Sequence, residues 1–391
     1  MSEHGGFVRA LAQNFTTVAT VPEGDENSYP LFYSNGFALL PGGRFVAVGN
    51  RVRRLRSGKG PIADGIVVAR SGDHGETWET VCFLPFQEVV ESALFVYEGT
   101  LYMLVGPRTH RGKVWILASG DEGKNWTQPI EIITAADGGE TPTWYCLHQT
   151  QMAVWDGKLY FSVSEICQKP AVICCDLAKG PLHAAAWRIS QLVEMPIPKE
   201  LNPGLFPGPS NRCLEGNVIR INGKLRVLSR AIIDRQGTAN MAAVFDLTDE
   251  QGELNFAFTQ LSALPGGQCK FYIIYDEPSK LFWMASNIAA NTQGWVEDPY
   301  PFKHPPGVSD RRFLMLWYAC DALNWFPAGC IAAAEKLTQS FMYPSVHVDG
   351  EDLAILSRSS LNSGHHHDAD CLTFHRVRNF RSLAMNIWPK V

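Results

Sequence analysis

Ser71-Gly-Asp73-His-Gly75-Glu-Thr77-Trp78 recurs in nearly the same form as Ser119-Gly-Asp121-Glu-Gly123-Lys-Asn125-Trp126. Both copies follow an apolar run, so a strand is predicted to end at each serine. In the turn that follows, the Asp side chain can accept backbone N–H groups, Gly supplies a positive φ, and Trp packs beneath the next strand. The repeat therefore predicts a recurring structural turn and not a reaction centre.

A third, degenerate copy reads Ala319-Cys-Asp321-Ala-Leu-Asn324-Trp325, which is one residue shorter and lacks the Gly. Repeats of roughly 40 to 50 residues that are built from short strands are typical of β-propeller blades. The repeat spacing therefore favours a propeller over a sandwich or a closed barrel.

A second pattern, an apolar strand followed by a tight turn and another apolar strand, supports this prediction. Asn-Gly and Asp-Gly between apolar runs are strong hairpin signals, and the signal is weaker at the second and fifth of the six turns named next. The six turns are Gly42-Gly43, Glu98-Gly99, Asp156-Gly157, Asn222-Gly223, Asp276-Glu277-Pro278 and Asp349-Gly350. No long stretch has a helical period. We predict an all-β fold, a six-bladed β-propeller that forms a single domain over residues 1–391, with an N-terminal strand at about residues 7–20 closing the last blade.

Composition limits the function classes. The chain has 391 residues, 46% of them hydrophobic, a formal net charge of -5 and no long basic run, so we expect no nucleic-acid partner. No apolar stretch is long enough to span a bilayer, and the polar N-terminus predicts a cytoplasmic protein, or a secreted or periplasmic one if a leader has been removed. The 10 cysteines lack metal-like spacing, which indicates buried thiols in a reducing compartment. The sequence does not indicate an oligomeric state.

The strand ends that should converge on one central cleft carry many ionisable and amide residues, which packing alone does not explain. These positions are Tyr33, Asn35, Asn50, Arg51, Arg54, Asp64, Glu91, Arg108, His110, His148, Gln149, Glu165, Glu215, Asn217, Arg230, Lys270, Asn287, Tyr343, Arg358, His365, His366, His367 and Asp368.

The repeated turn, Ser-x-Asp-x-Gly-x-Thr/Asn-Trp, resembles the Asp box of the sialidase (BNR-repeat) superfamily. Asp boxes lie at the blade periphery in that family and also occur in non-catalytic propellers. The resemblance therefore implies the architecture, and leaves the chemistry to other residues.

Two further segments are similar to the sialidase active site. The stretch from Leu214 to Arg230 resembles the one in which a Glu starts a strand and a substrate-binding Arg ends its partner, and the stretch from Ser340 to Gly350 resembles the one with the nucleophilic Tyr. The resemblance implies Tyr343 as nucleophile, Glu215 as its activating base and Asp64 as acid/base. It also implies Arg230 and Arg311 as substrate clamps, to which we add Arg51 from its expected position at the cleft. Further expected substrate contacts are His110, His148, Lys270, Arg358, His365, His367 and Asp368. We expect no metal or cofactor, but metal binding by His365 with His367 or Asp368 stays open as an alternative.

A Tyr nucleophile beside a Glu base suits a sugar whose own carboxylate would repel an acidic nucleophile. The resemblance therefore implies an exo-acting glycosidase with a carbohydrate substrate that is acidic or polyhydroxylated. The chain nevertheless lacks the Arg-Ile-Pro motif of sialidases, and Tyr33 stands near the position of its arginine. The loop from Gly364 to Asp370 is not a sialidase signature either, so the resemblance is to an atypical bacterial branch.

Other interpretations remain open. Glu215 and Arg230 can form a structural ion pair, and Tyr343 can be a strand aromatic. A polysaccharide lyase that uses His148 or His110 with Tyr343 on a uronate is a second function class. A carbohydrate-binding propeller without turnover is a third.

Overall fold

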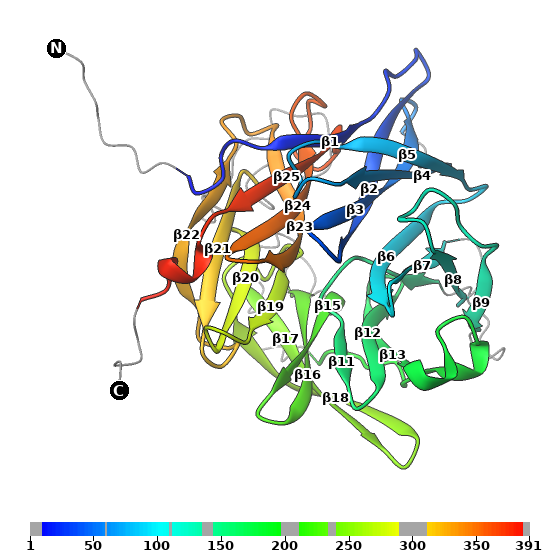
Figure 1. Ribbon diagram of the computed structural model, residues 1–391, viewed down its shortest axis with the longest axis vertical. Coiled ribbons are helices and arrows are strands. Elements are labelled where there is room, and N and C mark those ends of the chain that lie inside the picture. Colours follow the sequence, from blue (N-terminus) through cyan, green and yellow to red (C-terminus); the bar gives the residue numbers. More distant parts are fainter. Residues whose placement is uncertain are drawn as a thin grey trace.

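Six antiparallel sheets stand as blades around a central axis (Figure 1), so the predicted all-β, six-bladed propeller is confirmed. The computed structural model describes residues 10–58, 61–108, 112–134, 144–196, 211–233, 240–288 and 311–385. The first three blades comprise β2 (Ser28–Leu40), β3 (Arg44–Leu55), β4 (Ile62–Ser71) and β5 (Glu79–Pro85); β6 (Val90–Tyr97), β7 (Thr100–Pro107), β8 (Val114–Ser119) and β9 (Ile130–Ile133); and β10 (Tyr145–Cys146), β11 (Ala153–Trp155), β12 (Lys158–Glu165), β13 (Lys169–Asp176) and β14 (Trp187–Ile189).

The remaining blades follow the same order along the chain. They comprise β15 (Arg212–Ile221), β16 (Lys224–Ile232), β17 (Met241–Glu250) and β18 (Glu253–Ala263); β19 (Tyr272–Asp276), β20 (Leu281–Ile288), β21 (Phe313–Ala319) and β22 (Phe326–Ala333); and β23 (Ser340–Asp349), β24 (Asp352–Ser360), β25 (Cys371–Val377) and β1 (Thr16–Thr20). Three short 3-10 helices are η1 (Leu177–Lys179), η2 (Ala184–Ala186) and η5 (Phe380–Leu383). No helix among the described residues is long and apolar enough to cross a membrane.

The first and last described strands lie side by side in one blade (Figure 1). β1 pairs with β25, with Thr16 opposite Phe374. Pairing of the two ends within one sheet closes the ring, which leaves no gap between the first and last blades. Of the strand predicted at residues 7–20, residues 7–9 lie outside the described part of the chain, and the structure forms a strand at Thr16–Thr20.

Local turn chemistry builds the hairpins. Between β11 and β12 the turn residues Asp156 and Gly157 have φ of 49° and 69°, and between β15 and β16 Asn222 and Gly223 have φ of 49° and 73°. Two successive positive φ angles give the turn twist that matches the twist of paired strands. The predicted turns fall between the paired strands in all six blades.

The repeated turn is held by its own side chains. Ser71 Oγ donates to Asp73 Oδ1 at 2.8 Å and accepts the Gly75 N–H at 2.9 Å. Asp73 Oδ1 also accepts the Thr77 N–H at 2.9 Å, and Trp78 Nε1 donates to the Gly75 carbonyl at 3.1 Å. The Asp and Ser oxygens are therefore occupied by turn contacts, as a structural part requires.

The second copy of the turn repeats these bonds. Gly123 N–H donates to Ser119 Oγ at 2.8 Å, and Asn125 N–H donates to Asp121 Oδ1 at 2.9 Å. In the shorter third copy Asp321 Oδ1 accepts the N–H groups of the residues two and three positions on. One sequence pattern thus produces the same turn in different blades.

Buried amide side chains join the inner strands of neighbouring blades. Asn35 Nδ2 donates to the Tyr343 carbonyl at 3.2 Å, and Gln149 Oε1 accepts the Leu94 N–H at 2.6 Å. Asn217 Oδ1 accepts the N–H of a β19 residue at 3.1 Å. Part of the polar ring predicted for the cleft is therefore structural, because these amides satisfy backbone groups between blades.

Candidate active site

Three inner strands break register where they reach the same end of the propeller. β2 is bulged at Tyr33, β15 at Glu215 and β23 at Tyr343. Glu215 and Tyr343 have φ of 58° and 53°, in the left-handed region that bulky residues rarely adopt. A bulge re-aims a side chain, and such strain persists where the surrounding structure enforces it, which is common at functional sites.

The neighbouring residues explain how these bulges form. Gly216 follows Glu215, and a Cβ at this position would lie 2.5 Å from Ser162 Oγ and 2.6 Å from Ser229 Oγ. Only glycine fits this close approach. Pro344 follows Tyr343 and has no N–H to lose from the ladder at the bulge.

Glu215 is 5% exposed and is held by an arginine from the adjacent strand. Arg230 Nη1 donates to Glu215 Oε2 at 3.1 Å, and Arg230 Nε donates to the Gln268 carbonyl at 2.7 Å. Burial opposes ionisation of the carboxyl group, but Arg230 and His148 outweigh it and lower the pKa of Glu215 to about 2. Oε1 has no hydrogen-bond partner among the described residues. Glu215 is therefore an anion with one oxygen available.

Tyr343 is 7% exposed and lies among arginines. The guanidinium carbon of Arg358 is 4.0 Å from the Tyr343 ring centroid, and that of Arg311 is 5.6 Å away. Burial and the Glu215 charge raise the pKa of Tyr343, while Arg358, Arg230 and Arg311 oppose the rise. The phenol is consequently protonated at neutral pH, next to cations that stabilise any phenolate formed during a reaction.

His148 lies between two carboxylates. Its Nε2 is 3.6 Å from Glu91 Oε2 and 3.7 Å from Glu215 Oε1, and its ring centroid is 5.7 Å from that of Tyr343. Burial disfavours the imidazolium, but the charges of Glu91 and Glu215 outweigh it and raise the pKa of His148. Arg108 Nη2 and the Leu147 N–H hold Glu91 at 2.6 and 2.9 Å. Sequence reasoning placed Glu91 at the cleft but assigned it no role.

No protein-family model and no curated protein matches the chain. Solved structures do match. The Hadza microbial sialidase Hz136 is 18% identical with a TM-score of 0.55 over 89% of this chain and 66% of that chain. Trypanosoma rangeli sialidase in complex with 2,3-difluorosialic acid, described as a covalent intermediate, is 15% identical with a TM-score of 0.57 over 96% of this chain and 61% of that one.

In a third match the aligned region covers nearly the whole length of the other protein. Penicillium chrysogenum α-L-arabinanase complexed with arabinobiose is 13% identical, with a TM-score of 0.52 over 94% of this chain and 99% of that one. The chain has a sialidase-like fold. It spans less than two thirds of the length of the two sialidases, and identities this low establish the fold alone.

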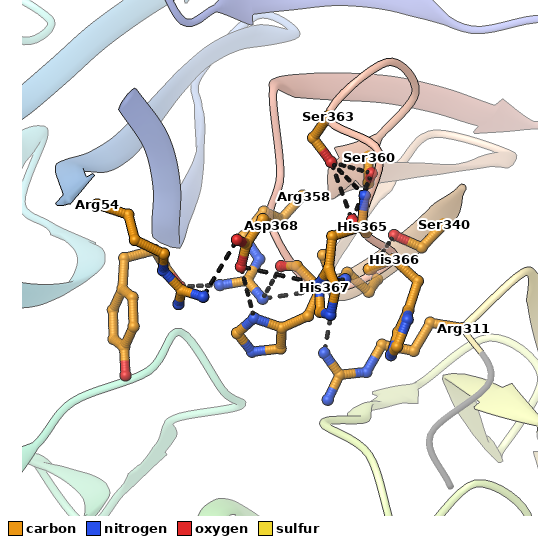
Figure 2. A network of polar contacts seen from close by, with 12 residues as sticks. Arg54, Arg311, Ser340, Arg358, Ser360, Ser363, His365, His366, His367 and Asp368 are labelled. Atoms are coloured by element: carbon orange, nitrogen blue, oxygen red, sulfur yellow. Dashed lines mark hydrogen bonds and ion pairs between the residues drawn. The ribbon is translucent and has the colours of Figure 1, made fainter. Parts of the chain in front are cut away.

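In this sialidase-like propeller an arginine from the last blade reaches the first inner strand. Arg358, on β24, donates to the carbonyl of Tyr33. It also donates to the His367 carbonyl at 3.3 Å (Figure 2). Burial lowers the pKa of Arg358. The Nε–H groups of Arg358 and Arg311 find no acceptor among the described residues. Arg358 therefore places a cation beside the bulge of β2 at Tyr33.

The loop between β24 and β25 is a dense polar network (Figure 2). Asp368 Oδ2 accepts a hydrogen bond from Tyr29 Oη at 3.0 Å and lies 3.2 Å from Arg54 Nη1. Asp368 Oδ1 is 3.3 Å from His367 Nδ1, and the His367 N–H donates to His365 Nδ1 at 3.1 Å. No group of three or more His, Cys, Asp or Glu side chains in the described ranges is arranged to hold a metal ion. The loop supports Arg358 through the His367 carbonyl.

Other predicted residues fall elsewhere. Arg51 and Asp64 pair with each other, with Arg51 Nε 2.5 Å from Asp64 Oδ2, and their side chains are 19% and 18% exposed. In the described part of the chain no hydrogen bond or ion pair joins this pair to Tyr343 or Glu215. His110 lies outside the described residues. The structure thus groups Glu215, Arg230, His148, Lys270, Arg311, Tyr343 and Arg358, and leaves Arg51 with Asp64 as a separate pair.

Lys270 gives a prediction for stability. Its ammonium group is buried, donates to the Pro344 carbonyl and lies 6.0 Å from the Tyr343 ring centroid. Burial lowers the pKa of Lys270 from 10.5 to about 7, against the Glu215 charge. Between these two values the unfolded chain binds more protons than the folded one, so this group makes stability rise with pH, by up to about 1.4 kcal/mol per pH unit.

We expect the free energy of unfolding in urea to increase more between about pH 7 and about pH 9.5 in the native protein than in Lys270→Met. The two proteins share all other titrating groups, so Lys270→Met serves as the reference for the native protein. Equal changes in the two proteins would show that Lys270 is charged throughout this range.

Proposed function

We propose that this protein is a glycoside hydrolase that removes a terminal acidic or highly hydroxylated sugar, with Tyr343 as nucleophile and Glu215 as its base. The observation that carries the proposal is the pair of strained bulges that hold these two side chains, buried, beside Arg230, Arg311 and Arg358. Strain and buried charge together at one cleft are typical of reaction sites. The fold shared with sialidases and an arabinanase supports the same reaction class.

The chemistry follows from the local charges. Tyr343 Oη would attack the anomeric carbon and pass its proton to Glu215, while the glycosidic C–O bond breaks and the departing oxygen takes a proton from an acid. Water then attacks the anomeric carbon of the glycosyl-tyrosine, which releases the sugar and restores the Tyr343 hydroxyl. Glu215 is ionised at neutral pH before the reaction, so it can accept the proton or stabilise positive charge on the sugar. The Arg358 guanidinium over the ring favours the developing phenolate.

Charge also indicates the substrate. Arg311 and Arg358 each have a buried Nε–H without an acceptor among the described residues, and leaving a charged donor unpaired is costly. A carboxylate on the sugar would pair with these groups in charge-assisted hydrogen bonds. We therefore favour an acidic sugar over a neutral one. Because both cations lie beside the same buried ring, that of Tyr343, we infer that a single terminal sugar residue binds there.

The acid that protonates the leaving group has two candidates. The family resemblance assigns this role to Asp64, whose carboxylate is bound to Arg51. His148 belongs to the Tyr343 cluster, and the flanking carboxylates keep its proton available. We propose His148 as the acid and Asp64 as the competing assignment.

These assignments predict different leaving-group effects. An acid is needed for a poor leaving group and much less for a nitrophenolate. We expect His148→Asn to lower kcat on natural glycosides by roughly 10²–10⁴-fold and to have a much smaller effect on nitrophenyl glycosides. Steady-state kinetics on both substrate types, with Asp64→Asn in parallel, provides the measurement. The same leaving-group dependence in Asp64→Asn, and not in His148→Asn, would transfer the role to Asp64.

A second function is favoured by one contact. The ring of His148 lies beside that of Tyr343, as a lyase needs if it abstracts a proton next to a uronate carboxylate and protonates the departing oxygen. Such a lyase forms an unsaturated sugar that absorbs in the near ultraviolet.

We also interpret the turns at Ser71 and Ser119 as Asp boxes of the BNR type, whose role is structural.

The test is a screen against sialosides, uronate-containing oligosaccharides and neutral aryl glycosides, with released sugar and near-ultraviolet absorbance as readouts. Sugar release that is lost in Tyr343→Phe supports the hydrolase. Growth of absorbance transfers the assignment to a lyase. Binding without turnover of any substrate identifies a carbohydrate-binding propeller.

A further inference from the structure

Two cysteines from separate elements, Cys146 and Cys167, lie in contact close to His148 of the candidate active site. Cys146 Sγ in β10 lies 2.6 Å from Cys167 Sγ in the turn between β12 and β13. The turn is unusual, because Ile166 and Cys167 are successive non-glycine residues with φ of 48° and 56°. The Ile166 N–H donates to the Trp144 carbonyl at 3.0 Å, which holds the turn against β10. The two sulfur atoms need to move about half an ångström to reach bonding distance.

The same short segments hold the carboxylates around His148. Next to Cys146, the Leu147 N–H binds Glu91 Oε2, and His148 follows directly. On the other side of the pair, the Gln168 carbonyl accepts the Cys213 N–H at 2.9 Å, close to the Glu215 bulge. A covalent bond between the thiols would therefore join the two segments that position His148 and Glu215.

The pair differs chemically from the other thiols of the same blade. The Cys146 thiol donates a hydrogen bond to Cys167 and, with His148 and against burial, lowers the pKa of Cys167 to about 6. Burial raises the pKa of Cys174 to about 11 and that of Cys175 to about 12. Cys167 is also partly exposed, whereas Cys174 and Cys175 are buried. Because the thiolate is the nucleophile in disulfide exchange, reaction is expected at Cys167 first.

We propose that Cys146 and Cys167 form a reversible disulfide that transmits the thiol redox state of the surroundings to His148. The oxidant is a low-molecular-weight disulfide. The Cys167 thiolate attacks one of its sulfur atoms and releases a first thiolate; Cys146, once deprotonated, attacks Cys167 Sγ and releases a second. Two protein thiols and one small disulfide thus give one protein disulfide and two small thiols, with two electrons passing to the oxidant and both protons to the released thiolates.

Oxidation changes the charge next to His148. Against the effect of burial, the charge of the Cys167 sulfur acts with those of Glu91 and Glu215 to raise the pKa of His148. A disulfide sulfur carries no negative charge, so the pKa of His148 is expected to fall on oxidation. An effect on turnover rests on the function proposed above, whereas formation of the bond does not.

The experiment equilibrates the full chain with mixtures of oxidised and reduced glutathione, blocks free thiols and maps the peptides by mass spectrometry. Trypsin cuts after Lys158, which separates Cys146 from Cys167, and fragmentation distinguishes Cys167 from Cys174 and Cys175 on its peptide. We expect a linked Cys146–Cys167 peptide that grows with the oxidised fraction and disappears on reduction. It should be absent from Cys146→Ser and Cys167→Ser, and retained in Cys82→Ser, which removes another partly exposed thiol.

A second readout tests the connection to the site. The His148 imidazole is titrated by NMR in the oxidised and reduced protein, and its pKa is expected to be lower in the oxidised form, with no such difference in Cys146→Ser. The proposal is overturned if Cys146 and Cys167 form only mixed disulfides with glutathione and no linked peptide. It is also overturned if both thiols stay unmodified in mixtures rich in oxidised glutathione. An identical His148 titration in both forms overturns the coupling. Both readouts are independent of turnover, so a failure of the proposed glycosidase activity is distinguishable from a failure here.

Discussion

Tyr343→Phe is expected to lower kcat by at least about 10³-fold while the fold and substrate binding are retained. The variant loses the only atom that can bond to the sugar, but keeps the ring on which Arg358 stacks. A nucleophile acts in the transition state, so the loss should appear in kcat more than in KM. Steady-state kinetics on the best substrate, with thermal unfolding of both proteins, provides the measurement.

Tyr160→Phe is the matched control. Tyr160 is also a buried tyrosine, and its hydroxyl donates at 2.7 Å to Asp249 of β17, outside the Tyr343 cluster. We expect this control to change stability and leave kcat within a few-fold of the native value. Comparable activity losses in the two variants would indicate that loss of a buried hydroxyl, and not of a nucleophile, explains the effect.

Glu215→Gln has the second large expected effect, on both stability and activity. The substitution preserves shape but leaves Arg230 buried without its counter-charge, which should destabilise the fold by about 3–5 kcal/mol. Loss of the base should also lower kcat by roughly 10²–10⁴-fold. Urea unfolding and kinetics at neutral pH check both values.

The pH dependence of this pair has a definite sign. Glu215 has a folded pKa of about 2 against an ordinary 4.5, so its contribution to stability is complete above 4.5 and is lost as pH falls toward 2. The native protein should therefore lose more stability than Glu215→Gln between about pH 5 and about pH 3. Glu253→Gln, an exposed glutamate on β18, should behave like the native protein. Equal acid sensitivity in native protein and Glu215→Gln would mean that the ion pair contributes little.

The fold was predictable because its signals are local. Asp156-Gly157 and Asn222-Gly223 determine their hairpins from adjacent residues alone, and the six turns lie where turn chemistry placed them. The repeated Asp turn is equally local, since all of its bonds fall within a few residues. Blade number and strand order follow from such short-range patterns.

The site was predictable only in part, because its geometry depends on contacts between distant residues. Glu215 and Tyr343 were identified by resemblance, but their left-handed bulges were not, since neither residue is itself a glycine. The contact of Arg358 with the Tyr33 carbonyl joins residues 325 positions apart, which no spacing rule reveals. Arg51 is opposite Gly65 in the β3–β4 pairing, and its side chain meets Asp64 at the register irregularity next to it.

The Cys146–Cys167 pair had no sequence signal. The two thiols meet because Ile166 and Cys167 both adopt positive φ, a conformation that neither residue type favours. Glu91 was identifiable as a cleft residue. Its role beside His148 depends on hydrogen bonds from Arg108, which follows β7, and from the backbone N–H of Leu147 in the next blade.

Covalent trapping tests the central claim, that Tyr343 is the nucleophile of a glycosidase, most directly. The native protein and Tyr343→Phe are incubated with fluorinated acidic sugars that carry a good leaving group, including 2,3-difluorosialic acid and fluorinated uronic acid fluorides, and labelled peptides are mapped by mass spectrometry. We predict one added sugar on Tyr343 in the native protein and none in the variant. A label on another side chain, or turnover of the matching natural substrate without any label on Tyr343, would contradict the account.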